Sequence, residues 1–331
     1  MTDTSLTALL DAIEPSTRDA GEGTFRVIAI PGCDRHYVGW NTQGHPCLLL
    51  GSEPGAFYAP VRLALLEAHF GNLHRIHPVN GAQREELLSV ITCTSQDMQA
   101  QTYFLHVCET ILRIVGAQPT LNAVVQSVQR LIEIFRSLSR PPKRSLNGLA
   151  GELFLIAASR NPAASVAAWR SSDVDRFDFS SGNVRLDVKA SAERLRIHHL
   201  SAEQCQPPSG TVGLLASVFI EASGGGQSLR ELVEQIETLL VGDANLILKV
   251  QQTVAETLGD GLASALAARF DDRLAITSLR FFDLATVPAI RDGIPAEVSG
   301  VHFRSDLSQT NQMEEREIGK VAELALNFLP R

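Results

Sequence analysis

The chain has 331 residues, of which 44% are hydrophobic and 20% are charged. This length corresponds to two or three domains of about 100–200 residues each, and the composition excludes disordered and fibrous proteins. With 29 Lys and Arg against 37 Asp and Glu, the formal net charge is −8, which argues against nucleic-acid binding over most of the surface.

The positive charge is concentrated in one segment. From Arg140 to His199 there are ten Lys or Arg and six Asp or Glu, a local balance of +4. Because phosphate binding depends on the charge at the contact, this segment is compatible with transient nucleic-acid contact. A fluctuation in Arg usage explains the same numbers equally well.

Three features favour a cytoplasmic protein with no membrane partner. Apolar stretches such as Val212 to Ile220 are much shorter than the roughly 20 residues that span a bilayer. The start, Met1 to Ile13, lacks the basic and apolar regions of a secretory signal. The five cysteines are odd in number and lack C-x-x-C spacing, which argues against a disulfide framework and a zinc site.

The first part of the chain predicts strands followed by helices. Short apolar runs alternate with Gly, Pro and Asn over the first ninety residues, and helical periodicity follows until Pro141-Pro142. These prolines predict a boundary between an N-terminal region, residues 1–142, and a second domain, residues 143–331. The predicted strands are Phe25–Ile30, Tyr37–Trp40, Cys47–Leu50 and Leu87–Cys93, and the predicted helices span 104–115 and 121–135.

Helices and strands are mixed in the second domain, which predicts an α/β or α+β fold. Helices are predicted at Leu146–Ser159, near 229–240 and 246–258, and in a last segment that ends about Leu329. Strands are predicted near Val166–Trp169, as a pair within Val174–Ala190, at Val212–Ile220, and near 274–284 and 298–303.

The sharpest local pattern is the strict alternation from Val184 to Ala190, which places Asp187 and Lys189 on one face of a strand. Asp178 precedes a predicted hairpin turn. If Ser181 and Gly182 form a two-residue loop, Asp178 lies opposite Arg185 and diagonal to Asp187, with Cα atoms roughly 7–8 Å apart. A three-residue loop would instead put Asp187 on the opposite face.

Two carboxylates at that separation suit one divalent cation, because Mg²⁺ is typically held by one or two carboxylates together with water and phosphate. Lys189 lies on the same face as Asp187, where its ammonium can orient a water or stabilise charge on a phosphate. The same residues have a purely structural interpretation, as the solvated face of an edge strand with Arg185 paired to Asp178.

A third acidic residue stands in an apolar helix. Glu152 is the only charged residue from Ser145 to Ser159, and such a helix should be buried. A buried carboxylate needs hydrogen bonds, an ion pair or a metal. Gly148 and Gly151 disfavour the helix by about 1 kcal/mol each relative to Ala, so they indicate close packing against another backbone.

The order of a helix with Glu, a strand with Asp and a strand with Asp-x-Lys resembles the PD-(D/E)XK nuclease superfamily, which has the restriction-endonuclease-like fold. A closer resemblance is to the bacterial "PD-(D/E)XK motif protein" family. The segments that carry it are Leu149–Leu155, Ala168–Arg170, Asp175–Phe179, Leu186–Ser191 and Arg196–Gln204.

The resemblance implies an αβββαβ core, a C-terminal α/β extension and Mg²⁺-dependent phosphodiester hydrolysis, with Mn²⁺ as a substitute ion. It implies Asp178 and Asp187 as metal ligands, Glu152 as an auxiliary ligand and Lys189 as the catalytic lysine. Phe177 stands where the family motif has Pro, and Asp187 where Glu is common. Neither departure removes an oxygen donor, because Asp binds a hard cation as well as Glu does.

Six further side chains near the proposed metal face are candidates for contact with DNA. The basic ones could contact phosphates, and the glutamine could reach a base or the attacking water. Surface arginines also occur without such a role, in exposed ion pairs that are worth little. The candidates are Arg170, Arg176, Arg194, Arg196, His199 and Gln204.

Two functional hypotheses follow. The first is a Mg²⁺-dependent DNA endonuclease of a bacterial restriction or phage-defence system, acting with other proteins of its locus, in which residues 1–142 recognise DNA or dock a partner. Cutting both strands requires two active centres or sequential nicks, which makes a homodimer conceivable. The second is a non-catalytic DNA-binding or scaffold subunit of a restriction complex, which the acidic net charge favours.

Overall fold

The computed structural model describes residues 5–13, 24–170 and 175–331. Its contacts divide the chain into two compact units: an N-terminal unit, residues 1–141 with 259–263, and a C-terminal unit, residues 142–258 with 264–331. The predicted strand pair starting at Val174 begins outside the described residues. Among the helices of the described segments, none is long and apolar enough to cross a bilayer.

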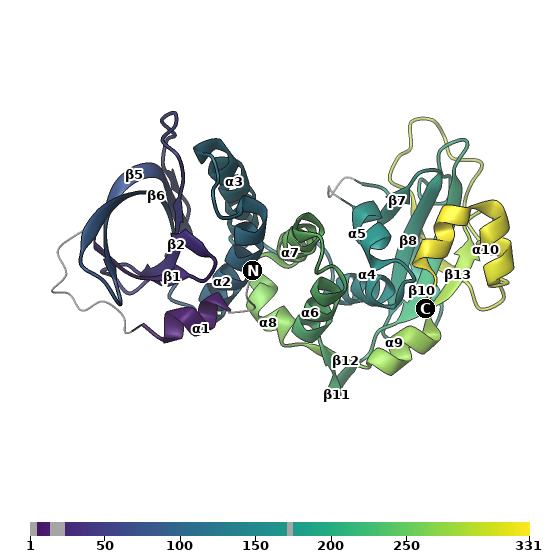
Figure 1. Ribbon diagram of the computed structural model, residues 1–331. Helices are drawn as coiled ribbons and strands as arrows, with labels where there is room; N and C mark the ends of the chain where they lie inside the picture. The colour runs from purple at the N-terminus through teal and green to yellow at the C-terminus, as the bar shows by residue number, and fades with distance from the viewer. Residues whose placement is uncertain (1–4, 14–23, 171–174) are drawn as a thin grey trace. The chain divides into compact units, whose positions relative to one another are not determined.

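The N-terminal unit is built on a sheet that closes on itself (Figure 1). The strand order is β1-β2-β3-β6-β5-β4, and a parallel pairing of β1 with β5 closes the ring. Buried side chains that include Val27, Tyr37, Leu49 and Val90 form a core cluster of this unit. The elements are α1 (Leu6–Asp11), β1 (Thr24–Ile30), β2 (Cys33–Trp40), β3 (Pro46–Gly51), β4 (Val61–Arg62), β5 (Leu66–Pro78), β6 (Arg84–Cys93), α2 (Met98–Val115) and α3 (Leu121–Ser137).

The four strands and two helices predicted for this region are present, but the prediction missed β5, the 13-residue strand. Its second half, from Asn72 to Pro78, carries mainly polar residues. A bulge at Gly71, where φ is +58°, interrupts the pairing with β6. Only Gly adopts that conformation readily, so its presence shifts the alternation that would reveal a strand.

The C-terminal unit contains a four-stranded sheet of order β13-β10-β8-β7. β7 (Phe179–Ser181) and β8 (Val184–Ser191) are antiparallel, and β10 (Val212–Phe219) runs parallel to β8. Helix α4 (Leu146–Ala158) precedes these three strands, and further helices separate them from β13 (Arg280–Asp283). This order confirms the expected mixed α/β fold with an αβββαβ core.

The remaining elements are two short strand pairs and several helices, and of these residues 259–263 belong to the N-terminal unit. β9 (Ile197–Ser201) pairs with β14 (His302–Asp306), and β11 (Ala222–Ser228) pairs with β12 (Arg269–Phe270). The helices are α5 (Pro162–Ala168), α6 (Leu229–Leu239), α7 (Ala244–Leu258), α8 (Leu262–Leu266), α9 (Asp272–Ser278) and α10 (Glu315–Val321), with short 3₁₀ turns at Gly259–Gly261 and Glu323–Phe328.

One predicted strand is wrong, and another is only partly right. Residues 166–168 lie in α5, because Asn161 caps the helix by accepting a hydrogen bond from Ala164 N and Pro162 occupies its first turn. Of 274–284, residues 274–278 lie in α9, where Asp271 caps the helix by accepting a hydrogen bond from Leu274 N, and Arg280–Asp283 form β13. In both places an Asn or Asp side chain caps the first turn, and this hydrogen bond favours a short helix over a strand.

The predicted hairpin register is also wrong by one position in the loop. Ser181 pairs with Val184 and Ser180 with Arg185, so the two-residue loop is Gly182-Asn183. Gly182 has φ +51°, which a primed hairpin turn requires at its first central position. Continuing this register places Asp178 opposite Asp187 instead of diagonal to it. The loop still has two residues, so both acids keep the same parity.

Gly151 lets α4 lie close to the sheet. A Cβ atom there would be 3.1 Å from Val218 Cγ1 and 3.2 Å from Ala190 Cβ. We expect Gly151→Val to lower the free energy of unfolding of the C-terminal unit by about 1–3 kcal/mol, because its methyl groups must push β8 and β10 away. Chemical denaturation measures the change. Gly242→Val is the control, since a Cβ at Gly242 meets no atom within 4 Å, and equal losses would contradict the packing argument.

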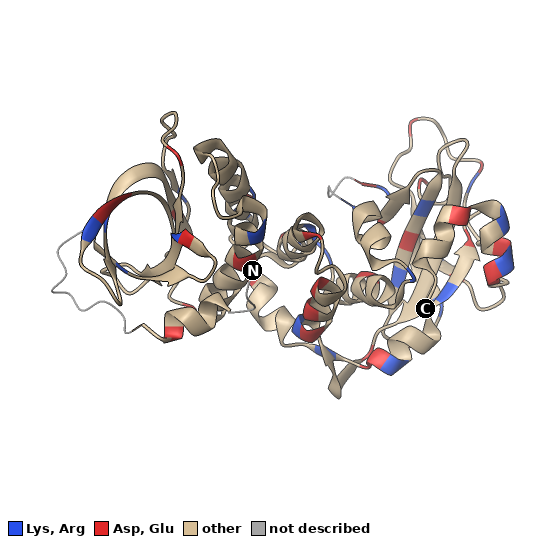
Figure 2. Ribbon diagram, viewed as in Figure 1, with Lys and Arg blue, Asp and Glu red and all other residues tan. Residues whose placement is uncertain are grey.

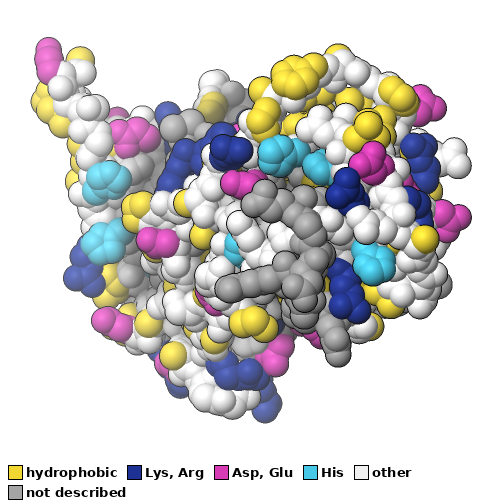
Figure 3. All heavy atoms as spheres, turned by 90° about the vertical axis from the view of Figure 1, so that its left-hand side faces the viewer, with side chains coloured by type: hydrophobic (Ala, Val, Ile, Leu, Met, Phe, Trp, Pro, Cys, Tyr) yellow, Lys and Arg dark blue, Asp and Glu magenta, His cyan; other side chains and the backbone are white. Residues whose placement is uncertain are grey.

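The N-terminal unit presents a surface of mixed charge. Figure 3 shows basic, acidic, histidine and hydrophobic side chains interspersed on the face turned to the viewer. Between Thr24 and Cys93 there are five Arg and five acidic residues and no Lys. This balance gives no support to a basic DNA-binding surface on the closed sheet.

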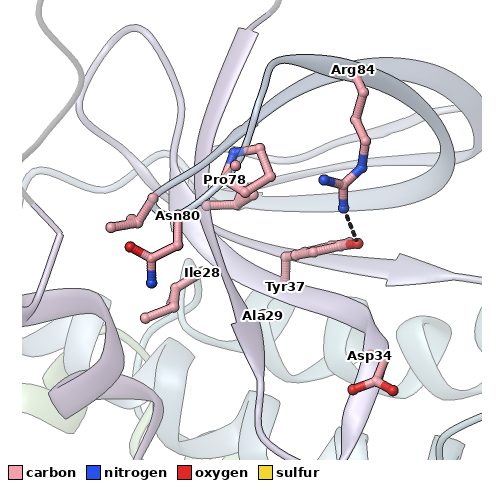
Figure 4. A pocket seen from close by; sticks show the side chains of 10 residues that line it. Ile28, Ala29, Asp34, Tyr37, Pro78, Asn80 and Arg84 are labelled. Carbon is pink, nitrogen blue, oxygen red and sulfur yellow. Dashed lines mark hydrogen bonds between the residues drawn. The ribbon is translucent and has the colours of Figure 1, made fainter.

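A hollow of about 390 Å³ opens in the N-terminal unit beside β1 and β2, near Pro78 and Asn80 (Figure 4). Arg84 Nη2 donates a hydrogen bond to Tyr37 Oη over 3.0 Å, and Tyr37 Oη is also 3.0 Å from a Glu86 carboxylate oxygen. These polar groups satisfy one another, so we assign them to holding β2 and β6 together.

Candidate active site

The charged face of β8 is separated from its apolar face by strand geometry. Val184, Leu186 and Val188 are buried, and Val188 packs toward Gly151 of α4. Asp187 and Lys189 point to the other face, as alternation requires. Figure 2 shows basic and acidic positions alternating along β8. The sequence pattern therefore becomes a strand with one side packed on a helix and the other carrying charge.

Asp178 and Asp187 come together across the hairpin. Asp178 lies just before β7, and its Oδ2 accepts a hydrogen bond of 2.9 Å from Val188 N, the amide that follows Asp187. Both residues are buried, with 5% and 3% of their surface exposed. Two carboxylates buried so close to each other repel, and this repulsion contributes to a raised pKa of Asp187.

Lys189 and Gln204 complete the surroundings of Asp187. Lys189 Nζ lies 2.8 Å from Asp187 Oδ2, and Gln204 Nε2 donates to Asp187 Oδ1 over 2.9 Å. Lys189 Nζ also donates to Gln204 Oε1 at 3.4 Å. The amide of Gln204 is held in place because its Oε1 accepts a hydrogen bond from Ser201 N. Gln204 thus orients both the carboxylate and the ammonium.

Burial and charge shift the pKa values of this pair. Burial raises the pKa of Asp187 to about 6, opposed by Lys189 and Arg144 and assisted by Asp178. Burial disfavours the Lys189 ammonium, but attraction to Asp187 and Asp178 outweighs it and raises the Lys189 pKa. Between about pH 4 and 6 the folded Asp187 keeps a proton that the unfolded chain has lost, so its contribution to stability falls as pH rises through this window.

At neutral pH Asp187 is therefore ionised in the folded protein, although burial disfavours its charge. Carboxylates with such shifted pKa values cluster at functional sites.

Glu152 is paired with an arginine inside the unit. Its Oε2 accepts hydrogen bonds from Trp169 Nε1, at 2.6 Å, and from Arg170 Nη1. Arg170 also donates to Thr257 Oγ1 over 3.1 Å and lies 3.6 Å from Asp178 Oδ1. The side chains of Glu152 and Arg170 are each only 4% exposed. The expectation that Glu152 is buried and partnered is confirmed, and its partner is Arg170.

The contacts described above join a charged cluster that consists of Arg144, Glu152, Arg170, Asp178, Asp187, Lys189 and Gln204. Arg144 is the member that the sequence did not reveal. It precedes Ser145, the residue that caps α4, and its Nη1 lies 3.0 Å from Asp178 Oδ1. Its charge also acts on Asp187 and Lys189. The available signal was its position next to the helix that carries Glu152, but nothing in the sequence indicates which way its side chain turns.

The six DNA-contact candidates occupy different environments. Arg176, Arg194 and His199 are exposed, although Arg194 Nε and Nη2 each donate a hydrogen bond of 2.6 Å to a carboxylate oxygen of Glu221. Arg170 is buried against Glu152. Arg196 donates a hydrogen bond of 2.7 Å to Ser217 Oγ, and its guanidinium lies over the ring of Phe219 at 4.6 Å from the ring centroid. The expected contact of Arg170 with DNA does not fit this position, because its side chain is 4% exposed and paired with Glu152. Arg196 is partly buried and is held by Ser217. Gln204 lies within the charged cluster.

The residues present fit a divalent cation held by two carboxylates. Asp187 Oδ2 is buried and faces Lys189 as an ion pair, yet it accepts no hydrogen bond of normal geometry from the described residues. A buried carboxylate oxygen that accepts no hydrogen bond still has lone pairs with which it can bind a hard cation. Across the described segments no group of three or more His, Cys, Asp or Glu gathers as a metal site. The fit therefore rests on Asp187 and Asp178 alone, with Glu152 engaged by Arg170.

The sequence matches a model of a known protein family. A family model described as "Putative PD-(D/E)XK family member, (DUF4420)" matches residues 13–308. No curated protein and no solved structure matches the chain. The match covers both units almost completely and includes every residue of the charged cluster. The chain belongs to this family of PD-(D/E)XK proteins.

Proposed function

We propose that this protein is a metal-dependent nuclease that hydrolyses phosphodiester bonds of DNA, with Mg²⁺ as its ion and Mn²⁺ as a substitute. The observation that carries the proposal is the contact of Lys189 with Asp187 at 2.8 Å, beside Asp178, on the charged face of β8. Family membership, which suggests a nuclease, agrees with this arrangement.

Each side chain has a proposed role. Asp187 and Asp178 would hold the cation, which when bound supplies a Lewis acid for the scissile phosphate. Lys189 would hold its ammonium toward the phosphate and stabilise the negative charge that builds up during in-line attack. Gln204 keeps Asp187 and Lys189 in place through its hydrogen bonds to both. We assign Glu152 to holding Arg170 beside Asp178, instead of to the metal.

The unit that carries the site also has exposed basic side chains. Arg176, Arg194 and His199 are exposed on the same unit and remain our candidates for phosphate contact. We further propose that the protein acts in a restriction or phage-defence system with other proteins of its locus. Residues 1–142 would recognise DNA or dock a partner, and two copies would serve to cut both strands.

Calorimetric titration with Mn²⁺ tests the metal assignment. We expect Asp187→Asn and Asp178→Asn each to weaken Mn²⁺ binding at least tenfold, because each removes one of two charged ligands. Asp272→Asn, an exposed carboxylate at the start of α9, is the matched control and should leave the affinity unchanged. Equal affinities for all four proteins would show that the cluster binds no metal.

The same proteins distinguish the enzyme from a non-catalytic subunit. Nicking of supercoiled plasmid that requires Mn²⁺ or Mg²⁺, stops with chelator and is lost in Asp187→Asn supports the nuclease. DNA binding by the wild type without any metal-dependent nicking would favour the DNA-binding or scaffold subunit.

A further inference from the structure

Arg144 occupies the carboxylate that the proposed cation needs. Its Nη1 lies 3.0 Å from Asp178 Oδ1, while Asp178 Oδ2 already accepts a hydrogen bond from Val188 N. Of the two oxygens, Oδ1 is thus the one engaged only by arginine side chains, Arg144 and the more distant Arg170 at 3.6 Å. A cation that binds Asp178 at Oδ1 must replace the nearer guanidinium.

The two arginines around Asp178 differ in how firmly they are held. The Arg170 side chain is 4% exposed and is fixed by Glu152 and Thr257. The Arg144 side chain is 31% exposed, and Asp178 is its one hydrogen-bond partner among the described residues. Its backbone lies just outside α4, before the cap Ser145, so no helix geometry fixes the direction of its side chain. Arg144 can therefore leave at small cost, whereas Arg170 cannot.

Charge explains why such a residue is useful. Without a cation, Asp178 and Asp187 would be two buried carboxylates facing each other with Lys189 and Arg170 nearby, and ionising both is unfavourable. The guanidinium of Arg144, 3.0 Å from Asp178 Oδ1, offsets part of this negative charge. A divalent cation would supply the same positive charge, so both need not be present.

We propose that Arg144 is a displaceable counter-ion of Asp178, which competes with the divalent cation for Oδ1 and holds the acidic pair together until the cation binds. This inference rests on the proposed function, because it requires metal binding at Asp178. It predicts that metal affinity and the Arg144 contact are coupled with opposite sign.

The test is calorimetric titration of the full chain with Mn²⁺, comparing wild type with Arg144→Ala and Arg144→Lys. We expect Arg144→Ala to tighten Mn²⁺ binding about tenfold, because a charge-assisted hydrogen bond no longer has to be broken. Arg144→Lys should give an intermediate affinity, since it keeps the charge without the guanidinium geometry. Arg160→Ala, which removes an exposed arginine paired with Glu315, should leave the affinity unchanged.

Thermal unfolding of each variant shows whether it is folded, and the conservative Arg144→Lys keeps the test valid if Arg144→Ala is not. Unchanged or weaker Mn²⁺ binding in both variants, with wild-type binding that depends on Asp178, would overturn the role of Arg144 alone. Wild-type binding that is insensitive to Asp178→Asn would overturn the proposed function and this inference together. As a second readout, Arg144→Ala should lower the Mn²⁺ concentration that gives half-maximal nicking.

Discussion

Lys189→Met is expected to reduce metal-dependent nicking of supercoiled DNA about 10²–10³-fold, the usual effect of removing one preorganised group that stabilises charge in a transition state. Methionine keeps most of the length and apolar stem of lysine but carries no ammonium. The loss should appear in the rate of the chemical step at saturating Mn²⁺, measured by single-turnover nicking.

Mn²⁺ affinity separates a catalytic role of Lys189 from a structural one. The lysine is not a ligand and its ammonium lies 2.8 Å from Asp187 Oδ2, so its removal should leave calorimetric Mn²⁺ binding as tight as in the wild type or tighter. Lys320→Met, an exposed lysine in the last turn of α10, is the matched control and should nick at the wild-type rate. Nicking by Lys189→Met at the rate of that control would contradict the assignment of Lys189 to the reaction.

Arg170→Met is expected to lower the free energy of unfolding of the C-terminal unit by about 3–5 kcal/mol. Removing one partner of a buried ion pair leaves the other charge uncompensated, here Glu152, which is 3% exposed. Trp169 donates to the same Glu152 oxygen, so its fluorescence reports on this part of the structure. Denaturant titration in a Trp40→Phe background, which leaves Trp169 as the single tryptophan, measures the change.

The double variant Glu152→Gln with Arg170→Met distinguishes an uncompensated charge from lost packing. Because it removes both charges of this pair, it should regain most of the stability that Arg170→Met alone loses. Arg160→Met breaks an exposed pair with Glu315 and should cost less than about 1 kcal/mol. A double variant no more stable than Arg170→Met would show that the pair is not the source of the loss.

The parts of the site that could be predicted are those governed by local periodicity. The alternation of β8 correctly separated Asp187 from Val188, and the apolar run around Glu152 correctly indicated a buried helix whose glutamate needs a partner. Gly151 correctly indicated close packing, although its neighbours are the side chains of Ala190 and Val218 instead of a backbone, and a Cβ at Gly148 would meet only Ser145 Oγ. In each case the information lies within about seven consecutive residues, because strand and helix geometry decide which side chains share a face.

The parts that could not be predicted depend on contacts between distant segments. Nothing near Glu152 shows that Arg170, rather than a metal, satisfies it, and nothing near Arg144 shows that its side chain turns to Asp178. The hairpin loop was misplaced by one residue because Ser181, Gly182 and Asn183 are all favourable turn residues. Residues 166–168 were assigned to a strand because so short an apolar run has no distinct period.

The hairpin turn at Gly182-Asn183 has a consequence for insertions and deletions. Side chains along a strand point alternately to the two faces of the sheet. One extra residue in this turn would therefore turn the Asp178 side chain to the opposite face, which α4 covers. Two extra residues would lengthen the loop and restore the arrangement. Among chains that retain both acids, the length of this turn should therefore vary in even steps.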